Sequence, residues 1–379
     1  MELRKFHIDD LPQDRIFILF NNDYRTKLFS LINEKYGFVK LNQEFFNNQL
    51  KYLTFKQWQR GKTGIKLHFI PLWFIVKLSK LFDIPIANLE NHILAYKGPS
   101  SSTIVSNPNL PLVEDERLLK ILAHMLGDGH VSGAFGTGLP KGKTHSEYRN
   151  FEPSLLDQFE KDLSVFGEIQ TAIDYEHGHI IIPTIVGYLL KHIYQINFDC
   201  FNSEIPTSLY ALPPNLLAGF IRAFGDDEAH VYDTHIDFYS ANKKLLLGLM
   251  RLIQIKFPNI QFSEMKINYH SKNPKYYFYV LSESRKEFFA QIGFDHEQKK
   301  KDLIFNIQRS SADREYKRGQ TKNFILQYLA QKQATAKELS RKMGVSHGQV
   351  LWHLNRLKKQ AKVQIRGKEK ISNLWSLTN

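Results

Sequence analysis

The sequence contains a single cysteine, Cys200, in 379 residues. One cysteine can form neither an internal disulfide nor a cysteine-rich zinc site, so both are excluded and a reducing compartment is expected. The chain also lacks an apolar run long enough to cross a membrane, and its start, MELRKFHIDD, lacks the apolar stretch of a signal peptide. We therefore expect a cytoplasmic protein that makes no membrane contact.

Positive charge is abundant but unevenly spread, with a formal net charge of +13 at pH 7. Residues 296–379 carry 19 lysines and arginines against six acidic residues, and residues 1–99 carry 15 against nine. Residues 100–295, in contrast, carry 17 against 23. Because basic segments attract phosphates, both flanks are expected to contact nucleic acid. The net acidic middle segment is less suited to bind phosphates than the two flanks.

One sequence pattern occurs twice in the middle of the chain, at 121–131 (ILAHMLGDGHV) and at 221–231 (IRAFGDDEAHV). Each copy is an apolar helical run that ends in an acidic residue followed by x-His-Val. The two acidic residues, Asp128 and Glu228, are 100 positions apart. A repeat of this length predicts one supersecondary unit used twice, and hence a pseudo-twofold domain.

Small residues four positions apart lie on one face of each predicted helix. They are Ala123 and Gly127 in the first copy, and Gly219 and Ala223 in the second. Small side chains allow two helices to approach closely, which would bring the two acidic ends side by side. Adjacent carboxylates at helix C-termini are unfavourable unless a cation lies between them. The pattern therefore predicts a site for Mg²⁺ (or Mn²⁺) at Asp128 and Glu228.

The two copies resemble the paired motifs of the LAGLIDADG homing endonucleases. The resemblance places Ala123 and then Gly127 at packing positions of the first motif, and Asp128 at the metal-binding acid. In the second motif it places Ala223 at the packing position and Glu228 at the acid. The family implies a catalytic, metal-binding role for both acids.

The sequence departs from the family pattern at two positions. Leu126 stands where the first motif usually has another acidic residue, and Ala229 replaces the usual terminal glycine. Because alanine in a left-handed helix cap costs roughly 1 kcal/mol, the second helix is expected to end in another way.

The expected fold class is α+β, with a core built as helix–strand–strand–helix–strand–strand–helix, twice. In the family, the open face of such a sheet lies along DNA. The residues expected on this face are His130, Ser132, Lys141, Lys143, His145 and Arg149 in the first half, and His230, Tyr232, Thr234 and His235 in the second. A solvated strand position is the alternative for each of them.

A basic segment in the N-terminal region predicts a helix that begins at an N-cap, Thr54, and ends at Gly61. This region resembles a helix-turn-helix of the phage-repressor type, with 54–60 as the recognition helix. It would present Lys56, Gln57 and Arg60 to DNA. The alternative is a small helical scaffold with a solvated basic face.

The last 59 residues predict three helices followed by two strands and resemble the winged helix of bacterial and archaeal transcription regulators. Gly344 is expected to end the second helix, and Ser346 to cap the third. The residues expected beside the major groove are His347, Gln349, His353 and Arg356, and those expected in the wing are Arg366, Lys368 and Lys370. A protein-binding winged helix is the alternative.

The predicted organisation is an N-terminal helical, helix-turn-helix-like region, a linker, the two-repeat domain, a basic helix with a linker, and the winged helix. The boundaries are 1–97, 98–113, 114–295, 296–320 and 321–379. The resemblance implies sequence-specific, Mg-dependent cleavage of double-stranded DNA by a monomer, with Lys266 or Lys275 as a basic residue that supports the reaction. The alternatives are a DNA-binding transcriptional regulator with an inactive core, and an RNA-splicing maturase.

Overall fold

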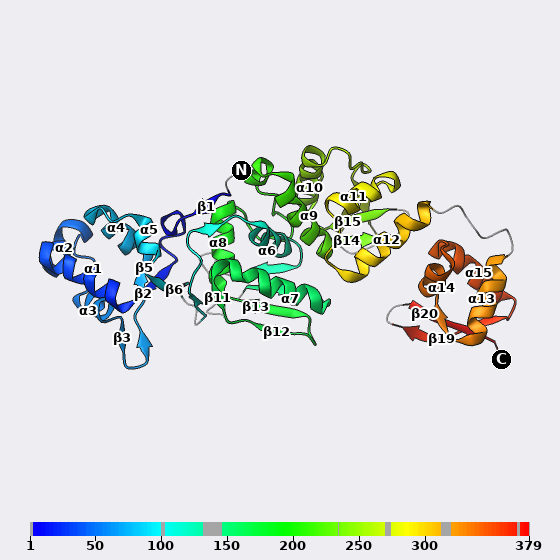
Figure 1. The fold of residues 1–379 in the computed structure, drawn as a ribbon, viewed down its shortest axis with the longest axis horizontal. Helices are drawn as coiled ribbons and strands as arrows, with labels where there is room; N and C mark the ends of the chain where they lie inside the picture. The colour runs from blue at the N-terminus through cyan, green and yellow to red at the C-terminus, as the bar shows by residue number, and fades with distance from the viewer. Residues whose placement is uncertain are drawn as a thin grey trace. The chain divides into compact units, whose positions relative to one another are not determined.

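The computed structural model describes residues 3–99, 103–131, 146–233, 235–269, 274–311, 320–369 and 372–378. The chain divides into two compact units. The first comprises residues 1–229, 238–258 and 265–277, and the second residues 230–237, 259–264 and 278–379. No helix in the described ranges combines the length and apolarity needed to span a membrane. Helices and small antiparallel sheets alternate along the chain, as expected for the α+β class (Figure 1).

The N-terminal region of the first unit is a mixture of helices and short strands. Its elements are β1 (Lys5–Phe6), η1 (Ile8–Asp10), β2 (Phe17–Phe20), α1 (Asn22–Lys35), α2 (Gly37–Phe46), α3 (Tyr52–Arg60), β3 (Lys62–Thr63), β4 (Lys66–Leu67), β5 (Ile70–Pro71), α4 (Leu72–Phe82), α5 (Ile86–Glu90), β6 (Ile93–Lys97), β7 (Val105–Ser106) and β8 (Leu112–Val113). Short strands therefore accompany the helices expected in this region. The run FILF at 17–20 is mostly buried and forms an interior strand of a five-stranded sheet, between β6 and β5, a common place for a short apolar run.

The segment expected to be a linker, 98–113, also contributes strands. β7 lies between β6 and β11 in a five-stranded sheet of order β11-β7-β6-β2-β5, and β8 pairs with β1. Val105 and Leu112 are buried. The polar residues around them suggested a linker, but the two segments pair with strands that are distant in the sequence or belong to the N-terminal sheet.

The first half of the repeated domain follows the predicted order of elements. It comprises α6 (Glu116–Leu126), β9 (Gly129–Val131), β10 (Ser146–Arg149), α7 (Pro153–Asp162), η2 (Leu163–Phe166), β11 (Glu168–Ile169), β12 (Ala172–Asp174), β13 (His179–Ile182) and α8 (Thr184–Tyr194). Four of the strands form a sheet of order β12-β13-β10-β9. The short strand β11 instead joins the N-terminal sheet.

The second half repeats the order. It comprises η3 (Thr207–Ala211), α9 (Pro214–Glu228), β14 (Ala229–Val231), β15 (Ile236–Ser240), α10 (Lys243–Lys256), β16 (Lys266–Asn268), β17 (Lys275–Val280), η4 (Ser282–Ser284) and α11 (Arg285–Gln291). The sheet order is β14-β15-β17-β16. Within the first unit, α6 packs along α9. This contact joins the two copies of the repeated pattern.

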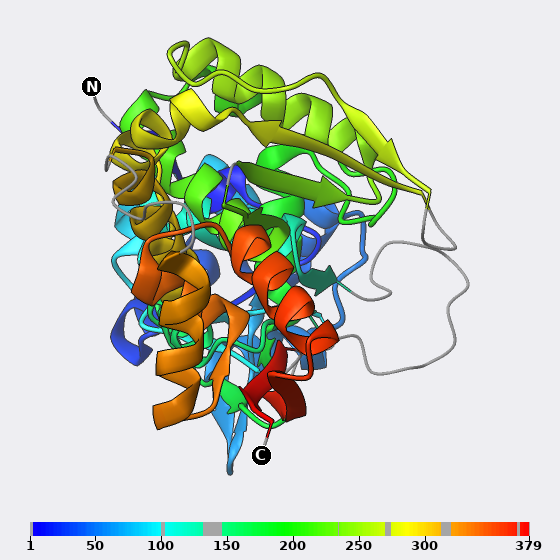
Figure 2. The same ribbon diagram turned by 90° about the vertical axis from the view of Figure 1, so that its right-hand side faces the viewer.

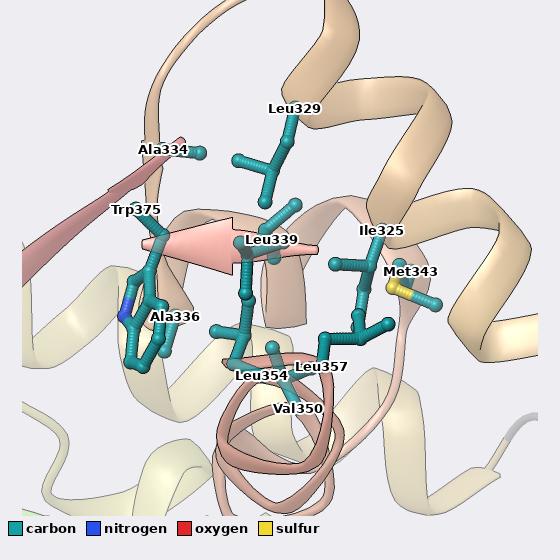
Figure 3. Packing of buried hydrophobic residues seen from close by; sticks show 11 residues of the cluster. Ile325, Leu329, Ala334, Ala336, Leu339, Met343, Val350, Leu354, Leu357 and Trp375 are labelled. Atoms are coloured by element: carbon teal, nitrogen blue, oxygen red, sulfur yellow. The ribbon is translucent and has the colours of Figure 1, made fainter. Parts of the chain in front are cut away.

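The C-terminal part of the second unit comprises α12 (Glu297–Ser311), α13 (Gln320–Gln331), β18 (Ala334–Thr335), α14 (Ala336–Met343), α15 (His347–Lys359), β19 (Val363–Glu369) and β20 (Ser372–Leu377). The last three strands form a sheet of order β18-β20-β19, and the β19–β20 hairpin lies against α13 and α15 (Figure 2). Trp375, Leu339 and Leu354 belong to one buried apolar cluster of this region (Figure 3). Gly344 ends α14 with a φ of 62°, and Ser346 caps α15, as predicted.

Candidate functional site

The two acidic residues of the repeated pattern lie at equivalent ends of α6 and α9. Asp128 directly follows Gly127, the C-cap of α6, and Glu228 is the last residue of α9. Each helix passes at once into a strand, β9 or β14. Ala229 has φ −102° and ψ 152°, so it is extended and avoids the left-handed cap that a glycine would favour. The alanine at this position therefore carries no left-handed strain.

The α6–α9 interface is close at the small residues of the pattern. A Cβ atom on Gly127 would lie 2.9 Å from Asp227 Oδ2, and one on Gly219 would lie 2.5 Å from Glu116 Cγ. The two alanines of the pattern, Ala123 and Ala223, are fully buried. A larger side chain at Gly127 would therefore displace the buried Asp227 carboxylate, whereas one at Gly219 would displace the half-exposed side chain of Glu116.

A buried polar cluster lies in this interface beside the two acidic ends. Asp227 accepts hydrogen bonds from Tyr148 Oη at 2.7 Å and from Asn150 Nδ2 at 3.2 Å, both at its Oδ1. Its Oδ2 lies 2.9 Å from His124 Nδ1. His124 is only 2% exposed. The cluster therefore connects α6, α9 and the strand β10 through one carboxylate, and it satisfies the polar atoms that the interface buries.

Electrostatics favour a charged pair of His124 and Asp227. Burial disfavours the imidazolium, but the charge and hydrogen bond of Asp227, together with the charges of Asp226 and Asp162, outweigh this effect and raise the pKa of His124. The pKa of the Tyr148 phenol is raised well above its ordinary value by burial and then by Asp227, with smaller contributions from Asp128 and Asp226. The phenol thus stays protonated and donates to Asp227.

The sequence interpretation missed this cluster. His124 stands inside the first apolar pattern, and Asp227 stands one position before the second acidic residue. A histidine and an aspartate within helices otherwise expected to be apolar were the available signal. Their sequence separation of 103 residues hid the pairing, because no local pattern reports on it.

The oxygen donors at the helix ends suit a hard divalent cation. Mg²⁺ is commonly held by one or two carboxylates, with water and substrate phosphates completing its shell. Asp128 and Glu228 are the carboxylates predicted to hold the metal. Both oxygens of Asp227 are engaged by neighbouring side chains. Within the described ranges, no group of three or more histidine, cysteine, aspartate or glutamate side chains is arranged to hold a metal.

The strands that follow the two helices carry several of the predicted nucleic-acid contacts. His130 is exposed on β9, opposite Glu147 of β10. The backbone N–H of Arg149 donates to the Asp128 carbonyl at 3.3 Å. The guanidinium of Arg149 lies 2.7 Å from Glu147 Oε1, and its side chain is 66% exposed. An exposed cation therefore lies on the strand next to Asp128.

The second half differs at the matching positions. His230 is exposed on β14. His235 lies 2.9 Å from Asp237 Oδ1, and its ring contacts Tyr232 and Tyr279. This side chain therefore has partners within the protein. The predicted contacts Ser132, Lys141, Lys143, His145 and Thr234 lie outside the described residues.

One face of the β16–β17 pair is basic and aromatic. Lys266 is opposite Tyr277, and the exposed Lys275 is opposite Asn268. Tyr277 stacks on Tyr239 of β15 with ring centroids 5.0 Å apart. The even-numbered neighbours Phe278 and Val280 are buried, so the pleat directs the lysines and tyrosines to the opposite face.

The predicted N-terminal recognition helix is α3, and its start differs from the prediction. The N-cap is Lys51, and Thr54 lies inside the helix, so the proposed Thr54 cap was wrong. Gly61 ends the helix with a φ of 68°, as predicted. Gln57 and Arg60 are exposed, whereas Lys56 is half-buried and donates to Gln59 Oε1 at 3.2 Å.

The predicted C-terminal contacts lie on α15 and on the β19–β20 hairpin. His347, Gln349 and Arg356 are exposed on α15, whereas His353 is half-buried. The exposed hairpin cations are Arg366 and Lys368, and Lys370 lies outside the described residues. The sequence interpretation missed Trp352, which is 56% exposed beneath the Arg356 guanidinium at 5.3 Å from the ring centroid.

Two sequence comparisons match parts of the chain. Residues 319–360 match the family described as bacterial regulatory protein, arsR family, a helix-turn-helix family. A stretch of 118 residues is 29% identical to a protein described as probable translation initiation factor IF-2 of Methanocaldococcus jannaschii. This match covers 30% of the chain and only 10% of that relative, so the chain spans about a tenth of its length.

Solved structures of homing endonucleases are among the structural neighbours. I-DmoI in complex with DNA and Ca is similar over 50% of this chain and 98% of that chain, with a TM-score of 0.37 and 12% identity. I-WcaI bound to its DNA recognition sequence has a TM-score of 0.33 at 12% identity, covering 51% and 87%. Full-length DUF199/WhiA from Thermatoga maritima has a TM-score of 0.32 at 14% identity, covering 65% and 91%.

Proposed function

We propose that the protein is a sequence-specific endonuclease that hydrolyses phosphodiester bonds of double-stranded DNA. The observation that carries the proposal is the packing of α6 along α9, with Asp128 and Glu228 at equivalent helix ends. Two carboxylates in related positions are suited to act on the two strands of a duplex.

Asp128 and Glu228 would hold Mg²⁺ (or Mn²⁺) with their carboxylate oxygens. When bound, the metal would stabilise negative charge on the phosphate and activate a water molecule for attack. The guanidinium of Arg149, on the strand beside Asp128, would contact a DNA phosphate near the site. The buried carboxylate of Asp227 would keep α6 and α9 in register rather than bind the metal, because its oxygens are already engaged.

The flanking modules would supply much of the affinity for DNA. The match of 319–360 to a helix-turn-helix family supports α15 as the element that enters the major groove. The exposed Arg366 and Lys368 would contact phosphates as a wing. The α3 helix would provide a second contact through Gln57 and Arg60.

A second function, favoured by a separate observation, is that of a transcriptional regulator whose core no longer cleaves. The matched helix-turn-helix family is described as a regulatory family. The net negative charge of residues 100–295 also disfavours tight binding of DNA by the core. Both functions predict sequence-specific binding to duplex DNA, and only the first predicts metal-dependent cleavage.

Incubating the full chain with a library of random duplex DNA, with and without Mg²⁺, separates the two functions. Sequencing of bound and cut ends would reveal a fixed cleavage site if the protein is a nuclease. Asp128→Asn and Glu228→Gln should each lower the cleavage rate at least about 100-fold and leave binding in place. Glu176→Gln is the control, since this exposed glutamate lies in the β12–β13 turn. Specific binding without cleavage would overturn the nuclease and support the regulator.

A further inference from the structure

The helix α3 is followed by a small hairpin whose tip is apolar and exposed. Strands β3 and β4 pair Lys62 with Leu67 and Thr63 with Lys66, leaving Gly64 and Ile65 as the turn. Gly64 has a φ of 58°, which glycine adopts without strain. Ile65 is 98% exposed. Isoleucine is not a residue that favours tight turns, and a side chain this exposed adds nothing to a hydrophobic core. The stability of the fold therefore does not explain why isoleucine occupies position 65.

The base of the hairpin is held firmly, in contrast to its tip. Arg25 is buried and packs so tightly on Gly61, which has a φ of 68°, that any Cβ atom there would clash with the guanidinium. The guanidinium donates to the Gln59 carbonyl at 3.3 Å at the end of α3. The backbone N–H of His68 donates to the Gly61 carbonyl at 2.8 Å.

A side-chain bond closes the same base. The His68 ring lies 2.9 Å from Thr63 Oγ1, and His68 is itself buried. The hairpin is thus fixed to the end of α3 through Thr63 of β3 and through His68, which directly follows β4. A fixed base allows the tip to project in a defined direction, because little conformational freedom remains to be lost on binding.

The charges around the tip indicate a polyanionic partner. Residues 51–68 contain five basic residues and no acidic residue. Lys62 and Lys66 are both exposed and flank the turn, and Arg60 is exposed on α3. Also exposed on α3 is Leu53, at 76%. The surface therefore combines phosphate-binding cations with one projecting apolar side chain.

We propose that the β3–β4 hairpin enters the minor groove of duplex DNA and inserts Ile65 as a wedge between two base pairs. Apolar side chains flanked by cations are used in this way, and they unstack a base step and bend the duplex. Lys62 and Lys66 neutralise phosphates on either side of the wedge, while α3 occupies the neighbouring major groove. The inference rests on the proposed binding of duplex DNA and adds that this binding bends the DNA at a site set by the N-terminal region.

The test uses the full chain and a duplex selected from a random library by the wild-type protein. Energy transfer between dyes at the duplex ends reports bending, and 2-aminopurine placed along the duplex reports unstacking. Ile65→Ser should abolish both signals and lower the affinity about tenfold. The serine side chain is too small and polar to compensate for the free energy of unstacking a base step. Because Ile65 buries nothing, thermal unfolding should be unchanged. Ile255→Ser, which alters an exposed isoleucine of α10, is the matched control and should bend DNA normally.

A second variant tests the flanking charges. Lys62→Gln combined with Lys66→Gln should reduce the slope of log affinity against log salt by about 1.8. An Ile65→Ser variant that bends and unstacks DNA like the wild type would overturn the wedge. So would stronger binding of the wild type to single-stranded RNA, or to vesicles of anionic phospholipid, in a manner that depends on Ile65. If the wild type binds no duplex at all, the proposed function itself fails.

Discussion

His124 Nδ1 lies 2.9 Å from Asp227 Oδ2 across the α6–α9 interface, and both side chains are buried. The pair connects the two copies of the repeated pattern within one turn of their acidic ends. A charge buried in this way is stable only while its partner is present.

Replacing Asp227 by asparagine should lower the free energy of unfolding by about 3 kcal/mol. The change leaves the buried His124 without a compensating charge, which is the costly way to break a buried pair. Denaturant unfolding followed by circular dichroism measures the difference. Asp14→Asn is the control, because its carboxylate is exposed beside Arg15 and should change stability by less than about 0.5 kcal/mol. Equal stability of both variants would contradict a structural role for Asp227.

The same pair predicts a dependence of stability on pH. Because the pKa of His124 is raised in the folded protein, its contribution is fully present below its ordinary value of about 6.5. The contribution is lost as the pH rises through the folded-state pKa. The difference in unfolding free energy between the wild type and His124→Gln should therefore shrink between acidic and alkaline pH. Two curves that stay parallel from pH 5.5 to 9 would contradict the charged pair.

Substituting Gly127 by alanine should destabilise the protein by about 2 kcal/mol. The added Cβ would meet Asp227 Oδ2 at 2.9 Å, in an interface already fixed by hydrogen bonds. Gly348→Ala is the matched control, because nothing lies within 4 Å of a Cβ there and α15 gains a better helix former. In thermal unfolding, Gly127→Ala should lower the melting temperature and Gly348→Ala should raise it. A Gly127→Ala protein as stable as the wild type would mean that the helices are not closely packed at this position.

Removing two cations from the β19–β20 hairpin should weaken DNA binding in a salt-dependent way. Arg366→Gln with Lys368→Gln should reduce the slope of log affinity against log salt by about 1.8, and lower affinity for all duplexes alike. Titration of labelled duplex at several salt concentrations measures the slope. Lys244→Gln is the control, because this lysine lies 3.1 Å from Glu204 and belongs to α10. An unchanged slope would show that these two hairpin cations do not contact DNA phosphates.

Much of the secondary structure followed from local patterns in the sequence. Both halves of the repeated core have the expected order of helices and strands. The caps Gly344 and Ser346 were predicted correctly, because capping depends on residues within a single turn. The cap at Thr54 was wrong, since the helix begins earlier and its N-cap, Lys51, makes no side-chain cap hydrogen bond that a pattern could reveal.

What the sequence determined by itself was the repeated helix with its acidic end, the basic flanks and the apolar faces of the C-terminal helices. These features depend on neighbours within a few positions, so their signal is local. Only the tertiary structure decided that Asp227 pairs with His124, that Arg25 holds the base of the β3–β4 hairpin, and that 105–106 joins a sheet. The physical reason is that buried polar groups and strand edges are satisfied by partners distant in the sequence, and packing alone selects those partners.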